Sequence, residues 1–249
     1  MYTAFARVYD ALMESVPYAA WAQHYGQLME QAGVPRQGRV VECACGTGSL
    51  TVPLQKMGYQ MTGVDLSADM LEEAMKKARA AGVSIPFVRL DMRKLTVPRR
   101  VHCVLATCDG VNYLTDGEQA KEFFRAAYDS LRPGGALIFD VSTPDKLRNA
   151  LGDRTLFSDD EGISYIWRNR FSPKDSRVEM DLSIFVRRDD GAYDRLEERQ
   201  CQRAHTRREL RKWLEETGFT DIAFFGRLRM TPPRSGDDRW HVAAVKKEI

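Results

Sequence analysis

The sequence predicts an α/β fold in which a mostly parallel sheet carries helices on both faces, together with a small antiparallel strand insertion. Two observations lead to this prediction. Apolar strand-like runs alternate with helix-like segments from residue 39 to 141, and strands joined by helices form parallel sheets. From about residue 146 the pattern changes, and apolar residues of the segments 163–171 and 178–186 alternate with polar neighbours, which is typical of half-buried antiparallel strands.

Length and charge fit a globular protein with one sheet-based core and an elaboration. The 249 residues are ample for a sizeable hydrophobic core, and the net charge of +2 comes from basic pairs interspersed with acids. A nucleic-acid-binding protein usually has a concentrated basic stripe, so a nucleic acid partner is not expected. No apolar run is long enough for export or for a membrane span, and we expect a cytoplasmic protein with no membrane partner.

Cysteine and histidine usage argues against a disulfide framework and against a metal centre. The five cysteines are an odd number, and one residue separates Cys43 from Cys45 where zinc-binding pairs have two. The four histidines are scattered, and no two have the spacing that places ligands on one helix face. We therefore expect buried thiols and no metal.

Residues 1–37 are predicted to form an N-terminal helical lid. Apolar residues of the segment 2–16 recur at helical spacing, and Pro17 ends the segment. A second helix is expected over 18–31. The first helix either closes over a ligand, with Tyr9 facing it, or is anchored to the core by its apolar side chains.

Residues 38–145 are predicted to form a ligand-binding core. Ser67 is the expected N-cap of one helix, and Thr115 with Glu118 is the expected capping box of another. The expected strands are 40–41, 60–65, 87–90, 101–106 and 136–140. The expected helices are 50–57, 67–81 and 115–131.

Residues 146–204 are predicted to form the antiparallel insertion, and residues 205–249 to complete the core sheet. The apolar face of the insertion is expected to cover either a cleft or a second subunit, which makes a homodimer one possible assembly. Thr206 with Glu209 is predicted to be a second capping box. The expected insertion strands are 163–171, 178–186 and 193–203. The expected C-terminal elements are a helix over 206–218 and strands over 221–225 and 240–245.

A glycine-containing loop follows the first strand. Reading outward from Glu42, the sequence is acid-x-Ala44-x-Gly46-x-Gly48, and small residues there let the turning backbone approach a ligand closely. A dinucleotide-binding loop places a third glycine where this chain has Thr51, so the match to that pattern is poor. Any glycine-rich turn between a strand and a helix looks similar, which is the structural alternative.

Two acids end the strands that follow this loop. Asp65 lies 19 residues beyond Gly46, about where nucleotide-binding α/β folds place the acid that binds ribose hydroxyls. Asp91 ends the next strand. Each acid alone could be a helix cap or a turn former. Because the carboxyl ends of parallel strands meet at one edge, both acids are expected to face the crevice beside the loop.

These motifs together resemble the class I S-adenosylmethionine-dependent methyltransferases of the small-molecule type, over about residues 38–142. The resemblance implies a Rossmann-like, seven-stranded sheet and S-adenosylmethionine as the cofactor. Ala44 departs from the family pattern, which has glycine there. Segments 2–13, 108–114 and 131–135 and the strand insertion also resemble a bacterial subgroup with many uncharacterised members.

The resemblance also implies roles for the loop and the acids. Glu42 would orient the methionine end, Gly46 and Gly48 would contact it through the backbone, Asp65 would hold the ribose, and Asp91 with Met92 would meet the adenine. The full set of expected cofactor-binding residues is Tyr9, Glu42, Ala44, Gly46, Gly48, Asp65, Leu66, Asp91, Met92 and Cys108.

The methyl acceptor is expected beside the turn after the fourth core strand. Asp109, Asn112 and Tyr113 offer donor and acceptor groups there and are the candidate catalytic residues. Asp109 and Asn112 could instead stabilise the turn, and Tyr113 could be a packing residue. The sulfonium already carries an activated methyl group, so a dedicated general base is not required.

Three functions agree with the sequence. The leading hypothesis is methyl transfer to a small metabolite such as an amine, an amino sugar or a hydroxylated compound. The second is an RNA or protein methyltransferase, which the modest charge disfavours. The third is a non-catalytic protein that binds the cofactor, because fold resemblance alone does not establish catalysis.

Overall fold

The structure is a computed structural model that describes residues 3–160 and 162–248. Its core is a seven-stranded sheet with the order β10-β11-β5-β4-β1-β2-β3. The pairs formed by β3, β2, β1, β4 and β5 are parallel, and β11 is antiparallel to both of its neighbours. The strands are β1 (Arg39–Cys43), β2 (Gln60–Asp65), β3 (Phe87–Arg89), β4 (Val101–Ala106), β5 (Leu131–Ser142), β10 (Phe219–Gly226) and β11 (Arg239–Lys246). The predicted fold class is confirmed.

Helices cover both faces of this sheet. Val40 belongs to a buried cluster with Trp21 of α2 and Leu54 of α3, whereas Val41 belongs to a second cluster with α5 and α6. Neighbouring residues reach opposite faces because side chains alternate along a strand. The helices are α1 (Thr3–Leu12), α2 (Tyr18–Gln31), α3 (Thr51–Lys56), α4 (Ala68–Ala80), α5 (Gly117–Ser130) and α6 (Arg207–Thr217). None of the described helices combines the length and apolarity needed to cross a bilayer.

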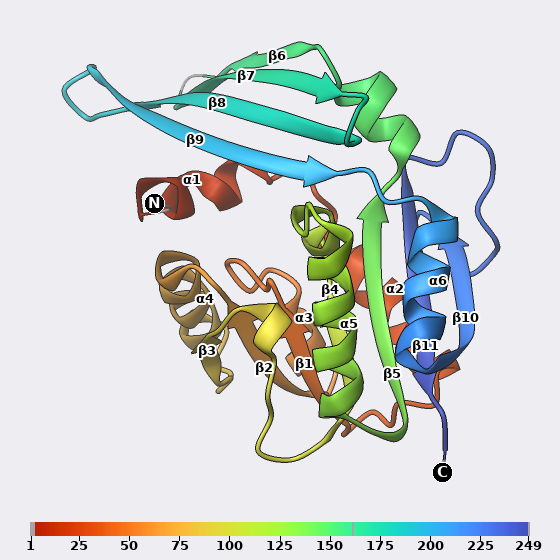
Figure 1. The fold of residues 1–249 in the computed structure, drawn as a ribbon. Coiled ribbons are helices and arrows are strands. Elements are labelled where there is room, and N and C mark those ends of the chain that lie inside the picture. The colour runs from red at the N-terminus through yellow and green to blue at the C-terminus, as the bar shows by residue number, and fades with distance from the viewer. Residues whose placement is uncertain (1–2, 161, 249) are drawn as a thin grey trace.

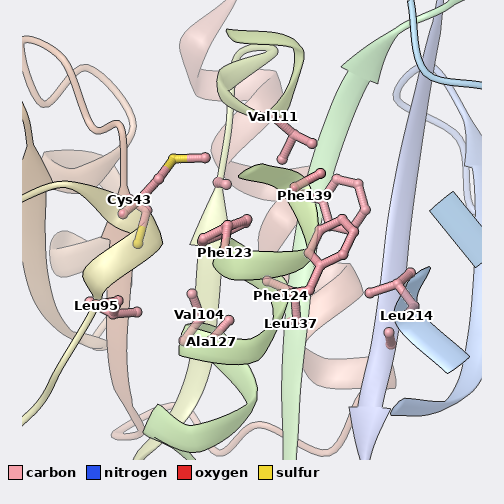
Figure 2. Packing of buried hydrophobic residues seen from close by; sticks show 14 of the residues in the cluster. Cys43, Leu95, Val104, Val111, Phe123, Phe124, Ala127, Leu137, Phe139 and Leu214 are labelled. Carbon is pink, nitrogen blue, oxygen red and sulfur yellow. The ribbon is translucent and has the colours of Figure 1, made fainter. Parts of the chain in front are cut away.

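Aromatic side chains fill the core between α5 and the sheet (Figure 2). The ring centroid of Phe124 lies 5.8 Å from that of Phe123 and 5.4 Å from that of Phe139, and all three side chains are fully buried. Burying one such side chain stabilises the fold by about 1.5–3 kcal/mol. This packing fixes β4 and β5 against α5, and the segment after β4 carries part of the site.

A four-stranded antiparallel sheet with the order β6-β7-β8-β9 lies over the carboxyl ends of the parallel strands (Figure 1). The sequence predicted three of these strands and missed β6. The side chain of Phe157 in β6 is 78% exposed, so this edge strand lacks the alternating pattern of a half-buried strand. The strands are β6 (Thr155–Asp159), β7 (Ile163–Ser172), β8 (Arg177–Arg187) and β9 (Tyr193–Arg203).

Helix α1 lies between this small sheet and α4 (Figure 1). Phe5 and Val8 are buried against Met70 of α4 and Ile184 of β8. The helix ends at Leu12, four residues before the predicted end, and the next residues form turns. Tyr2, which the prediction included, lies outside the described residues. The cluster is separate from the two clusters on the sheet faces, so α1 is held by the insertion and α4.

The predicted helix caps are confirmed at two sites and corrected at one. Ser67 accepts a hydrogen bond from Met70 N, and Thr206 forms the predicted capping box with Glu209. The cap of α5 is Asp116, not Thr115, and its carboxylate accepts from Glu118 N at 3.0 Å. The Thr115 carbonyl instead accepts from the Arg177 side chain of β8, a contact that no local pattern reveals.

Three short helical turns and the full length of β5 were not predicted. The turns are η1 (Met92–Lys94), η2 (Gly110–Tyr113) and η3 (Lys146–Leu151). β5 begins at Leu131 and not at residue 136, because Leu131 already pairs with Val101 across an irregularity in the β4–β5 register. Turns of this length leave almost no periodic signal in a sequence.

Candidate active site

A cavity of about 430 Å³ opens at the carboxyl ends of the parallel strands. Its walls come from the glycine loop after β1, the segments that follow β2, β3 and β4, helix α1, the start of α2, and β9. Open parallel sheets bind ligands at this edge, where the loops converge. The cavity is therefore the candidate site, and the small sheet with α1 forms its outer wall.

The glycine loop has left-handed backbone conformations at alternate residues. The φ angles of Ala44, Gly46 and Gly48 are +51°, +53° and +72°. A residue with a side chain costs about 1–2 kcal/mol in this conformation, so Ala44 is strained where the family pattern has glycine. A Cβ on Gly48 would lie 3.1 Å from Ala74 Cβ of α4, whereas no atom lies within 4 Å of the corresponding position on Gly46. Gly48 thus permits helix packing, and Gly46 leaves room for a ligand.

Glu42 lines the cavity and is 1% exposed. Its two carboxylate oxygens accept hydrogen bonds from Thr51 Oγ1 at 2.5 Å and from Thr107 Oγ1 at 2.6 Å. Burial raises the pKa of Glu42 to about 7, although both threonine hydrogen bonds act to lower it. The side chain is fixed in one orientation, and its charge has no cationic partner among these contacts.

Asp65 lines the cavity at the end of β2. Its oxygens accept hydrogen bonds from Gly46 N at 2.8 Å and from Ser67 N at 2.9 Å. Burial raises the pKa of Asp65, and these backbone hydrogen bonds oppose the rise. The carboxylate is therefore held beside the glycine loop with lone pairs left for ligand hydroxyls. The exposed side chain of Leu66 lines the cavity next to it.

Asp91 and Met92 line the cavity beyond β3. The Asp91 carboxylate forms a bidentate contact with Arg93, at 3.0 Å to Nε and 2.5 Å to Nη2, and the guanidinium lowers the pKa of Asp91. Leu90 and Met92 add apolar surface at this end. The sequence did not reveal Arg93 as a lining residue, since a basic residue after a strand is usually a solvated side chain.

Aromatic and thiol groups form the opposite end of the cavity. Tyr9 of α1, Tyr18 at the start of α2, and Cys108 after β4 all line it. Burial raises the pKa of Tyr9 and of Tyr18, and proximity to Cys108 raises both further. Tyr9 and Cys108 were predicted to lie at the site. Tyr18 was missed, and only the packing of α2 beside the loop brings it there.

Tyr113 is the one predicted catalytic residue that lines the cavity. It lies in η2, is 41% exposed, and its hydroxyl donates a hydrogen bond to Gln200 Oε1 of β9 at 2.8 Å. The sequence analysis missed Gln200. A signal existed, because Glu198, Gln200 and Gln202 place polar groups at alternate positions along β9, on a face that a purely structural strand would make apolar.

The structure places Asp109 and Asn112 outside the cavity lining. Asn112 is fully buried, donates to the carbonyls of Ser142 and Arg203 at 3.2 and 2.9 Å, and accepts from Ser142 N at 2.9 Å. Asp109 forms an ion pair with Arg239 at 2.8 Å. Their contacts correspond to the structural alternative for these two residues, since each connects the turn to another part of the fold.

Comparisons with known proteins agree with this geometry. Residues 40–135 match the model of a methyltransferase domain family. A Geobacillus sp. (strain WCH70) protein, provisionally named a methyltransferase, is 36% identical over 98% of this chain and 99% of its own length. A crystal structure of an S-adenosylmethionine-dependent methyltransferase from Clostridium acetobutylicum has a TM-score of 0.87 and 28% identity, covering 99% of both chains. The chain belongs to the class I S-adenosylmethionine-dependent methyltransferases.

The small sheet belongs to the shared fold. The structure of CalS10 from Micromonospora echinaspora, an amino pentose methyltransferase with S-adenosylmethionine bound, has a TM-score of 0.74 and 18% identity, over 96% of this chain and 97% of that one. The residues of the present chain fit the same cofactor. Gly46 leaves open space, Asp65 offers a desolvated acceptor beside it, and Leu90 with Met92 offers an apolar surface for a planar ring.

Proposed function

We propose that this methyltransferase acts on a small molecule, which binds in the end of the cavity enclosed by α1, η2 and β9. The enclosure supports this proposal, because the small sheet and α1 cover the site from outside and leave a cavity of about 430 Å³. That volume is in the range of small-molecule sites. A polymer substrate would need an open groove or a basic surface leading to the cofactor.

The Tyr113–Gln200 hydrogen bond is the observation that carries this proposal. It joins η2 of the core to β9 of the insertion at the cavity wall. Two elements that are distant in the sequence thereby present an amide and a hydroxyl next to the expected position of the methyl group. Such convergent polar groups in an otherwise aromatic enclosure orient a small ligand.

The cofactor-side residues have distinct proposed roles. Glu42 faces the ammonium group of the methionine end, Asp65 accepts from the ribose hydroxyls, and Asp91 meets the adenine edge. The buried position of Glu42 supports its role, because an approaching cation would compensate the desolvated carboxylate. Asp91 would keep its bond to Arg93 and offer only its remaining lone pairs.

The chain's contribution to the reaction is positioning. When bound, S-adenosylmethionine supplies a methyl group on a positively charged sulfur. Tyr113 and Gln200 then orient the acceptor, while α1 and the small sheet exclude water from the reacting atoms. Holding two reactants in line in this way removes much of the entropic barrier of a bimolecular reaction. Helix α1 is proposed to act as the lid.

Isotopic transfer tests the proposal. The purified full-length protein is incubated with methyl-labelled S-adenosylmethionine and, separately, with the dialysable small molecules, the RNA and the proteins of a bacterial extract. Label is expected in the small-molecule fraction and absent with Asp65→Ala, which should bind the cofactor poorly. Label in RNA or protein would instead establish the second hypothesis. Binding of the cofactor without transfer to any fraction would favour a non-catalytic protein.

A matched pair of substitutions then places the acceptor. Tyr113→Phe and Gln200→Leu should each lower turnover on the labelled acceptor while changing cofactor affinity by no more than about twofold, because they contact the acceptor side. Loss of cofactor binding together with turnover would assign both residues to the cofactor site or to the fold.

A further inference from the structure

The cavity has a marked division of charge. Among the described residues that line it, the charged side chains are Glu42, Asp65, Asp91 and Arg93. Glu42 lies in β1, Asp65 ends β2, and Asp91 and Arg93 follow β3, all at the end proposed for the cofactor, and each has polar partners there. The opposite end is lined by tyrosines, a thiol and uncharged amides. The described acceptor-side lining thus contains neither a cation nor an acid.

Tyr9, Tyr18 and Cys108 at the acceptor end remain protonated at neutral pH. Burial raises the pKa of Tyr9, of Tyr18 and of Cys108 above the usual values of a phenol and a thiol. The Tyr113 hydroxyl donates a hydrogen bond to the amide oxygen of Gln200. Tyr9, Tyr18 and Cys108 are therefore not bases that remove a proton from an acceptor.

The carboxylates that act on the acceptor-end tyrosines have other partners. The Asp10 carboxylate is paired with Lys77, Asp109 is paired with Arg239, and Glu42 is assigned above to the ammonium group of the cofactor. Asp10 and Asp109 affect the pKa of Tyr18, but neither lines the cavity. Among the described residues that line this end, a neutral alcohol would thus find no carboxylate, imidazole or amine to deprotonate it, and an acceptor anion would find no cation to balance its charge.

We propose, on the basis of the proposed function, that the acceptor is an uncharged amine and that the reaction is N-methylation without an enzymic base. The nitrogen lone pair forms the N–C bond as the C–S bond breaks, and the sulfur keeps that electron pair as a thioether. The positive charge thereby moves from sulfur to nitrogen. The extra proton of the new ammonium then passes to water.

The aromatic enclosure fits this movement of charge. Tyr9, Tyr18 and Tyr113 come from three different elements and line the same end of the cavity. Ring faces attract ammonium groups, most strongly where water is excluded. A tyrosine-lined end without formal charge therefore accommodates the amine and stabilises the ammonium group that transfer creates.

Identification of the methylated atom tests the proposal directly. The protein, ¹³C-methyl S-adenosylmethionine and the dialysable fraction of a bacterial extract are incubated, and the products are read by proton–carbon correlation NMR. The carbon and proton shifts distinguish methyl groups on nitrogen, oxygen, carbon and sulfur. An N-methyl product is expected. An O-methyl or C-methyl product would overturn the amine assignment and leave the proposed function intact, whereas absence of any product would contradict the proposed function itself.

A binding experiment tests the same chemistry without the natural acceptor. The protein saturated with S-adenosylhomocysteine is titrated with choline and with its uncharged isostere, 3,3-dimethylbutan-1-ol. Choline should bind about 3- to 30-fold more tightly, as expected for a cation over aromatic rings. Equal affinities would overturn the proposal.

The role of the rings is separated from that of the hydroxyls by two substitutions. Tyr18→Leu should bind choline about tenfold more weakly than Tyr18→Phe does, because only the latter keeps the ring.

The rate of N-methylation should rise with pH to a single inflection set by the acceptor amine. That inflection should persist in Tyr18→Phe, and its disappearance would make the tyrosine a base and contradict the mechanism.

Discussion

Asp10 of α1 and Lys77 of α4 form an ion pair, with 2.7 Å between Oδ2 and Nζ. The same carboxylate accepts a hydrogen bond from Thr47 Oγ1 of the glycine loop at 2.6 Å, and Lys77 donates to Ser49 Oγ at 2.5 Å. Helix α1 is thereby tied to the loop that would hold the methionine end of the cofactor. The contact couples the position of the proposed lid to the cofactor side of the cavity.

Asp10→Ala is expected to speed cofactor release without unfolding the protein. The side chains of Asp10 and Lys77 are 45% and 29% exposed, so their pairing should contribute less than about 1 kcal/mol to stability. Stopped-flow release of S-adenosylhomocysteine should be several times faster than in the wild type. Glu72→Ala removes a more exposed ion pair on α4 and should leave the release rate unchanged. Equal release rates in the wild type and Asp10→Ala would show that the contact does not hold the lid.

Asp65→Ala is expected to weaken binding of S-adenosylhomocysteine by about 10- to 100-fold, because hydrogen bonds between hydroxyls and a carboxylate are worth roughly 1.5–3 kcal/mol. Isothermal titration calorimetry measures the effect. Asp69→Ala, in the first turn of α4, is the matched control and should bind normally. Unaltered affinity in Asp65→Ala would remove this residue from the cofactor site.

Glu42 should make the stability of the ligand-free protein depend on pH. Its pKa in the folded state is raised from 4.5 to about 7, so the folded protein holds this proton more tightly than the unfolded chain does. The stability from Glu42 is therefore complete below about pH 4.5 and is lost as the pH rises through about 7, by roughly 3 kcal/mol in all.

Glu42→Gln should remove this pH-dependent part of the folding stability. Urea unfolding between about pH 5 and 8 should show a flatter profile for this variant than for the wild type, with the difference growing toward the higher pH. Thr51 and Thr107 can rotate their hydroxyl groups to accept from the amide, so the local packing is retained. Parallel profiles for the two proteins would mean that Glu42 ionises normally in the fold.

Asn112→Ala is expected to destabilise the protein by about 2–4 kcal/mol, because it leaves two buried carbonyls and one buried N–H without the side chain they contact. Chemical denaturation measures the loss. Tyr113→Phe, one residue along the same turn, removes only a hydroxyl that is near solvent and should cost much less. If the Asn112→Ala protein were normally stable but did not transfer methyl groups, the result would instead support a catalytic role for Asn112.

The sequence alone determined the type and order of most elements. Strand and helix patterns from residue 39 to 141 identified the parallel sheet, because burial on both faces makes its strands apolar, and glycine spacing after Glu42 identified the loop. The capping box at Thr206 and Glu209 was also visible, since it is a contact between residues three apart. Contacts of this kind join residues that are close in the sequence, so the sequence pattern reveals them.

The tertiary structure alone decided which side chains share the cavity. Tyr18 and Gln200 are 182 positions apart, and they line one space because α2 packs beside the glycine loop while β9 passes over the strand ends. Asn112 and Tyr113 are neighbours with equivalent sequence signals, yet one is buried in backbone contacts and the other lines the cavity. No local pattern distinguishes them, because the orientation of each depends on β5 and β9, elements that reach the turn only when the chain is folded.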